Sequence, residues 1–105
     1  MTAPLVDFTR LRALEEELSA DDVRSLVGTF IETTATMVTD LGTALASGAG
    51  SEAARIAHRV KGGALAIGAD ALAELAGRIE TGGEVAVTQV AATWDRTVSA
   101  LTNRS

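Results

Sequence analysis

The 105-residue sequence has no cysteine, one proline, one histidine, one lysine and only 3% aromatic residues. Without cysteine there is no disulfide, no thiolate nucleophile and no thiolate metal ligand, and a single histidine excludes a multi-histidine metal site. Because large rings are scarce, the core must be built from Ala, Leu, Val and Thr, which have to pack closely. Such packing favours helices.

Long apolar runs and positive charge are also scarce. No run approaches the roughly 20 residues that span a bilayer, and the N-terminus lacks a basic region followed by an apolar one. The net charge of -5 and the pI near 4.7 disfavour binding to nucleic acid or to anionic lipid, because both would repel the chain. We therefore expect a cytoplasmic protein that forms a single domain over residues 1–105.

The spacing of apolar residues predicts two helices in the first half of the chain. A short helix over residues 7–18 has Asp7 as its N-cap. A long helix begins at Ser19, with Asp22 three residues later in a variant of the capping box, and ends at Gly48. The apolar stripe of the short helix is Phe8, Leu11, Leu14 and Leu18, and that of the long helix is Val23, Leu26, Val27, Phe30, Ile31, Met37, Val38, Leu41 and Leu45.

Three further helices are predicted in the second half. The third has Ser51 as its N-cap and runs to Ile67, where Gly68 stops it. Asp70 caps the fourth, which ends at Gly82 and Gly83. The three apolar stripes are Ala53, Ile56, Ala57, Val60, Ala64 and Ile67, then Leu72, Leu75, Ala76 and Ile79, then Val87, Val90, Ala91, Trp94, Val98 and Leu101. The prediction is an all-α fold, an antiparallel four-helix bundle with an additional short N-terminal helix, present as a monomer.

His58 is predicted to face water. At 100° per residue, the apolar stripe of the third helix clusters between about 160° and 260° from His58, on the opposite side. This geometry disfavours a histidine buried in the core, whereas a surface histidine without a function remains an alternative. Lys61 and Gly62 flank His58 at about -60° and +40°.

The neighbours of His58 argue against an idle surface histidine. Residues 51–67 carry a net charge of +2, from three basic residues (Arg55, Arg59 and Lys61) and one acidic residue (Glu52). Because the net charge of the whole chain is -5, the remaining residues carry -7. Lys61 lies one turn after His58, where its ammonium can reach an anion attached to the imidazole.

The two glycines that follow weaken the helix by about 0.8–1.0 kcal/mol each. The missing β-carbon of Gly62 opens space for another molecule beside His58. Gly63 lies near the border of the buried face, where close helix packing is an equally good explanation. Leu65 is in line with His58 and fits a docking surface.

An exposed neutral imidazole can accept a phosphoryl group and pass it on. A hydrolytic triad is disfavoured, because no carboxylate lies one turn from His58 on its own helix. A convex helix face also offers no concave site for acid–base catalysis. We therefore expect a covalent carrier, whose partner brings the metal and the catalytic groups.

The segment AHRVKGGALAIGADALAELAGRIE resembles the signature of histidine-containing phosphotransfer (HPt) domains. That signature is His, any residue, aliphatic, Lys, Gly, small residues and an aliphatic–Gly pair, matched by His58, Val60, Lys61, Gly62, Gly63, Ala64, Ile67 and Gly68. Val60 replaces a more frequent Leu, and Gly63 stands where Ser or Ala is more common. The resemblance implies that His58 is the phosphoacceptor, that Lys61 neutralises phosphoryl charge and that Gly62 gives clearance to the partner.

The resemblance also implies the partners. These are response-regulator receiver domains and a hybrid or cognate histidine kinase, with Mg supplied by the receiver, no cofactor or metal held by this chain, and no kinase or phosphatase activity of its own. The residues expected at the docking surface are Arg55, Arg59, Leu65 and Arg78, and Arg78 is also the candidate for a polar contact from the neighbouring helix to the imidazole. The alternatives are an HPt-like scaffold that docks receivers without phosphotransfer, and the phosphorylated domain of a chemotaxis-type kinase.

Overall fold

The computed structural model describes residues 4–103, and these contain five α-helices and no strand. The helices are α1 (Phe8–Glu17), α2 (Ala20–Ala46), α3 (Gly50–Ile67), α4 (Asp70–Glu80) and α5 (Val87–Thr102). The prediction of an all-α fold is confirmed. None of these helices is both long and apolar enough to cross a membrane.

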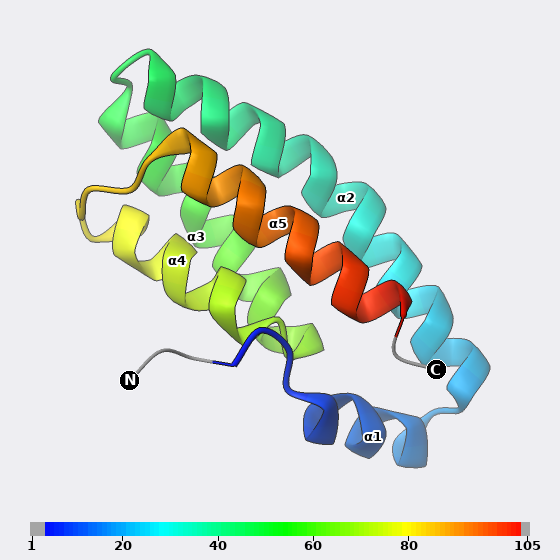
Figure 1. Ribbon diagram of the computed structural model, residues 1–105. Helices are drawn as coiled ribbons and strands as arrows, with labels where there is room; N and C mark the ends of the chain where they lie inside the picture. The colour runs from blue at the N-terminus through cyan, green and yellow to red at the C-terminus, as the bar shows by residue number, and fades with distance from the viewer. Residues whose placement is uncertain (1–3, 104–105) are drawn as a thin grey trace.

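Helices α2 to α5 form a bundle in which consecutive helices run in opposite directions (Figure 1). Helix α2 contacts α3 and α5, and α4 contacts the same two helices from the other side, so the four close a ring around the core. The 27 residues of α2 are about 40 Å long, which accounts for the 42 Å long axis of the molecule. Helix α1 packs against α2 across one end of the bundle (Figure 1).

Two of the four predicted N-caps are confirmed. The Asp7 carboxylate accepts hydrogen bonds from the backbone N–H groups of Thr9 (3.0 Å) and Arg10 (3.3 Å). The Ser19 hydroxyl accepts one from the Asp22 N–H at 3.0 Å. These contacts satisfy donors that have no partner within the helix.

The caps predicted at Ser51 and Asp70 are wrong, because each lies inside its helix. The N-cap positions are Ala49 and Ala69, and neither makes a side-chain cap bond. The reason is the shortness of the turns. The Ala49 N–H donates a hydrogen bond to the Ala44 carbonyl at the end of α2 (2.9 Å), and the Ala69 N–H donates one to the Ala64 carbonyl at the end of α3 (2.8 Å). Each of these alanines therefore belongs to the end of one helix and is also the N-cap of the next.

Gly68 allows α1 to be joined to the bundle. Its φ of +87° is left-handed, and a β-carbon there would lie 3.0 Å from the Asp7 carbonyl oxygen. Only glycine suits both conditions. The Gly68 carbonyl in turn accepts a hydrogen bond from the Asp7 N–H at 2.7 Å. The turn between α3 and α4 therefore holds the segment that leads into α1.

The predicted stripes of α3 and α4 are buried in full, whereas those of the other helices are only partly right. Phe8, Leu18, Leu26, Val87 and Ala91 were expected inside and are exposed. Their places are taken by small and polar residues, namely Thr34, Ala44, Thr93 and Thr97. A threonine can be buried in a helix because its hydroxyl can bond a carbonyl one turn back, as Thr97 does with the Thr93 carbonyl at 2.7 Å.

The two large aromatic rings of the bundle meet between α2 and α5. The centroids of Phe30 and Trp94 are 6.0 Å apart with the planes at 58°, a tilted arrangement that aromatic pairs favour. Apart from the buried threonines, the other buried side chains of the core are Ala, Val, Leu and Ile. The composition predicted such a closely packed core of small side chains.

Candidate functional site

His58 projects outward from the middle of α3. Its side chain is 68% exposed, while Ala57 and Val60 beside it are fully buried. A β-carbon at Gly62, one turn further on, would meet no atom within 4 Å. The predicted exposure of the imidazole and the open space beside it are therefore confirmed.

One carboxylate from the neighbouring helix holds both His58 and Lys61. Glu80 is the last residue of α4, and its Oε2 contacts the Nδ1 of His58 while its Oε1 accepts a hydrogen bond from the Lys61 Nζ at 2.5 Å. The stem of Lys61 reaches Glu80 across Gly77, where a β-carbon would lie 3.6 Å from the Lys61 Cδ. The absence of a side chain at Gly77 thus leaves room for the lysine on the surface of α4.

The Glu80 contact determines which imidazole nitrogen can react. The hydrogen bond from Lys61, and after it that from His58, lowers the pKa of the Glu80 carboxyl below its ordinary value of 4.5. An ionised carboxylate only accepts hydrogen bonds, so the hydrogen of the neutral imidazole must be on Nδ1. The lone pair is then on Nε2, the nitrogen away from Glu80. The site therefore presents an oriented nucleophile to the solvent.

The prediction that Arg78 contacts the imidazole is wrong, because Glu80 occupies that place and Arg78 lines a cavity between α4 and α5 instead. His58 thus has an orienting carboxylate, although its own helix supplies none. Sequence reasoning missed Glu80, which lies 22 residues from His58. The available signal was the pair Gly77 and Glu80, which lie three residues apart and hence on one face of α4.

The basic spot predicted around His58 is smaller than its residue count implies. Arg55 is paired with Glu52 on the same helix at 2.5 Å, and Lys61 is paired with Glu80. For Arg59 no ion pair is found within residues 4–103. Since paired charges largely cancel in the field seen by an approaching molecule, Arg59 is the main source of positive potential here.

An apolar groove of about 460 Å³ lies on the opposite flank of α3 from Glu80. Gly63 and Ala66 of α3 line it with Leu26, Phe30 and Met37 of α2. Gly63 packs towards α2, since a β-carbon there would lie 3.6 Å from the Phe30 ring. Leu26 is 44% exposed, and Leu65, the residue before Ala66 on α3, is 56% exposed, so apolar surface continues beyond the groove.

Within the described residues, no group of three or more His, Asp or Glu side chains could hold a metal ion. The site therefore consists of an exposed imidazole with a fixed tautomer, an ammonium within reach and a cleared surface. Such an arrangement can carry a group covalently on Nε2.

Comparison with known families places most of the chain in one of them. The model of the Hpt domain matches residues 25–104, about three quarters of the chain, and this range includes α3, α4 and α5 in full. Searches of curated proteins and of solved structures found nothing that matches the chain.

Proposed function

The chain belongs to the Hpt domain family, whose members carry phosphoryl groups on a histidine in two-component signalling, and on this premise we propose that His58 accepts a phosphoryl group and relays it to or from the aspartate of a receiver domain. The observation that carries the proposal is the Glu80 contact to Nδ1 of an exposed His58. It leaves Nε2 as the nucleophile on the open side of α3.

In the transfer step, the Nε2 lone pair attacks the phosphorus of an aspartyl phosphate. A nitrogen–phosphorus bond forms, the bond from phosphorus to the aspartate oxygen breaks, and the aspartate leaves as a carboxylate. The phosphorylated imidazole keeps its Nδ1 hydrogen and gains positive charge. Glu80 stabilises that charge through the existing hydrogen bond. Donation to a receiver reverses these bond changes.

Lys61 supports the step as a mobile cation. Its ammonium, already held on the His58 side of α4 by Glu80, can turn towards the phosphoryl oxygens on a flexible stem. We propose that the chain uses no cofactor of its own and that the receiver brings Mg, because positioning and charge neutralisation supply most of the catalysis in phosphoryl transfer. With these partners the protein would act in the cytoplasm, as a monomer and without kinase or phosphatase activity of its own.

The docking surface we propose lies around Gly62. Gly62 leaves room above the helix, and the apolar groove and Leu65 offer surface for burial beside it. Arg59 adds positive charge, which would favour the acidic pocket of a receiver. Arg55 lies on the same exposed side of α3, whereas Arg78 faces α5 and has no place in this surface.

The test is phosphotransfer from a phosphorylated receiver in the presence of Mg, with the product assayed as acid-labile, base-stable phosphate. We expect the wild type to be labelled and His58→Gln to remain unlabelled while still folded by circular dichroism. Normal labelling of His58→Gln would disprove the site. Receiver binding without any labelling of the wild type would favour the scaffold function instead.

A further inference from the structure

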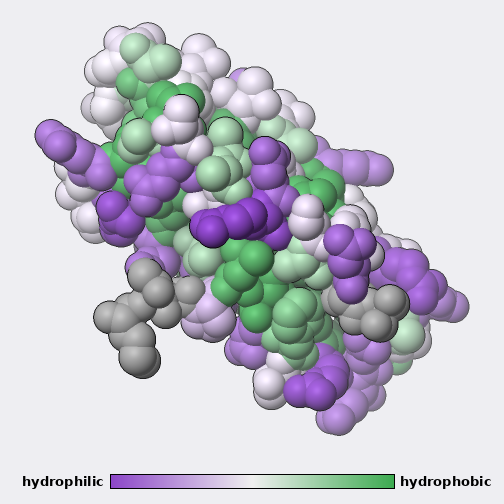
Figure 2. Space-filling view, viewed as in Figure 1, coloured by the Kyte–Doolittle hydropathy of each residue, from purple (hydrophilic) through white to green (hydrophobic). Residues whose placement is uncertain are grey.

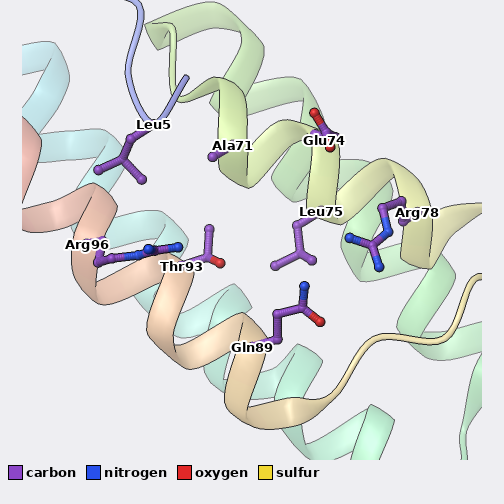
Figure 3. Close-up of a pocket in the computed structure, with 8 residues that line it drawn as sticks. All are labelled: Leu5, Ala71, Glu74, Leu75, Arg78, Gln89, Thr93 and Arg96. Atoms are coloured by element: carbon purple, nitrogen blue, oxygen red, sulfur yellow. The ribbon is translucent and has the colours of Figure 1, made fainter. Parts of the chain in front are cut away.

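A second candidate site lies between α4 and α5, on another side of α4 from Glu80. Here a cavity of about 320 Å³ is lined by Arg78, Leu75, Gln89, Thr93 and Arg96, among others (Figure 3). The proposed phosphotransfer uses none of these five residues. Strongly hydrophilic side chains lie beside apolar ones on this face of the molecule (Figure 2).

Two arginines from different helices enter this cavity from opposite ends. Arg78 comes from α4 and Arg96 from α5, and both guanidinium groups extend into the space between the helices (Figure 3). Neither guanidinium group has an ion pair or hydrogen bond within residues 4–103. Glu74 of α4 also lines the cavity (Figure 3). With two arginines and one carboxylate, the lining of the cavity carries a net positive charge, although the chain as a whole is acidic.

Thr93 offers this cavity a hydroxyl group that has no protein partner among residues 4–103. The residue is only 6% exposed, yet no hydrogen bond of its hydroxyl is found within the described part of the chain. No fully enclosed side-chain nitrogen or oxygen there lacks a partner, so the Thr93 hydroxyl oxygen must keep some exposed surface, on a residue that lines the cavity. A largely buried hydroxyl without a protein partner is costly unless water or a ligand bonds it.

The arrangement of these groups specifies a class of ligand. Guanidinium groups bind carboxylates and phosphates through paired N–H donors. Leu75, Thr93 and the Gln89 amide lie between the two arginines (Figure 3). The volume is at the lower end for ligand pockets, which suits a small metabolite. We propose that this cavity binds a small organic anion with a carboxylate or phosphate group at each end and a short apolar or hydroxylated middle.

Isothermal titration calorimetry of the full chain tests the proposal. The probes are succinate and glutarate as dicarboxylates and pyrophosphate as the two-ended phosphate, with acetate and inorganic phosphate as one-ended controls. We expect at least one two-ended anion to bind, and more tightly than its one-ended control. Preference for the dicarboxylates or for pyrophosphate identifies the anionic group. Absence of binding by all three two-ended probes, or equal binding of the one-ended ions, would overturn the proposal.

Variants locate the site. Arg78→Gln and Arg96→Gln should each weaken binding about tenfold or more, because each removes a charge-assisted contact, and Thr93→Val should weaken it less. Arg12→Gln is the matched control, since Arg12 is an exposed arginine of α1 outside the cavity. Equal weakening by Arg12→Gln would show unspecific attraction and overturn the proposal. His58→Gln should bind as the wild type does, so the result is independent of phosphotransfer.

Discussion

At the scale of single residues, the reactivity of His58 depends on one carboxylate. Glu80 contacts both Nδ1 of His58 and Nζ of Lys61, so it orients the nucleophile and also holds the cation that would meet the phosphoryl group. Its side chain is 25% exposed, which shields these hydrogen bonds from water more than those of a fully exposed pair.

Replacing Glu80 by Gln should therefore slow phosphotransfer to His58 about tenfold, since the amide keeps a hydrogen-bond acceptor but loses the charge that stabilises the phosphorylated imidazole. The measurement is the initial rate of labelling by a phosphorylated receiver. Glu84→Gln, which removes the same charge from the exposed loop after α4, should leave the rate unchanged. Equal rates for Glu80→Gln and the wild type would show that Glu80 does not assist the transfer.

At the scale of the elements, α3 combines a fully apolar inner face with an outer face that carries the site. All six residues of its predicted stripe are buried, which is why sequence periodicity placed His58 correctly. The stripes of α2 and α5 were less well predicted. Which of their threonines and alanines face inward depends on how these two helices pack against each other and how α2 packs against α1 and α3. Propensity and periodicity do not encode such mutual packing.

Gly62→Gln should stabilise α3 by about 0.8 kcal/mol through helix propensity and yet slow phosphotransfer, because the new side chain would occupy the cleared surface beside His58. The matched control is Gly28→Gln at an exposed site in α2, where a β-carbon also meets no atom within 4 Å. Urea unfolding and the labelling rate are to be measured for both. A labelling rate unchanged in Gly62→Gln would exclude a clearance function for this glycine.

At the scale of the whole molecule, the contacts of Glu80 with His58 and Lys61 join α3 to α4 and thereby connect the site with stability. The pKa of Glu80 is lowered in the folded protein by Lys61 first and His58 second. A carboxyl with a lowered pKa stabilises the fold above its unfolded pKa and loses this contribution as the pH falls through the folded pKa. The stabilisation by Glu80 is thus complete at neutral pH. It begins to decline near the ordinary pKa of 4.5 and is lost as the pH falls through the lower pKa of the folded protein.

Urea unfolding of the wild type and of Glu80→Gln between about pH 7 and about pH 3 tests this linkage. The wild type should be the more stable protein at neutral pH, and the difference should shrink as the pH falls below 4.5. The subtraction removes the effects of all other carboxyls that titrate in both proteins. A difference that stays constant over the range would contradict the linkage.

The sequence by itself determined the helical class, the outward position of His58 and the residues Lys61 and Gly62 beside it, because these depend on interactions within about one turn of a helix. Only the tertiary structure decided that Glu80 holds His58, that one residue both ends a helix and begins the next, and that Arg78 and Arg96 share a cavity. These contacts join separate helices. Their geometry follows from the angle and register at which helices pack, which the spacing within one helix does not contain.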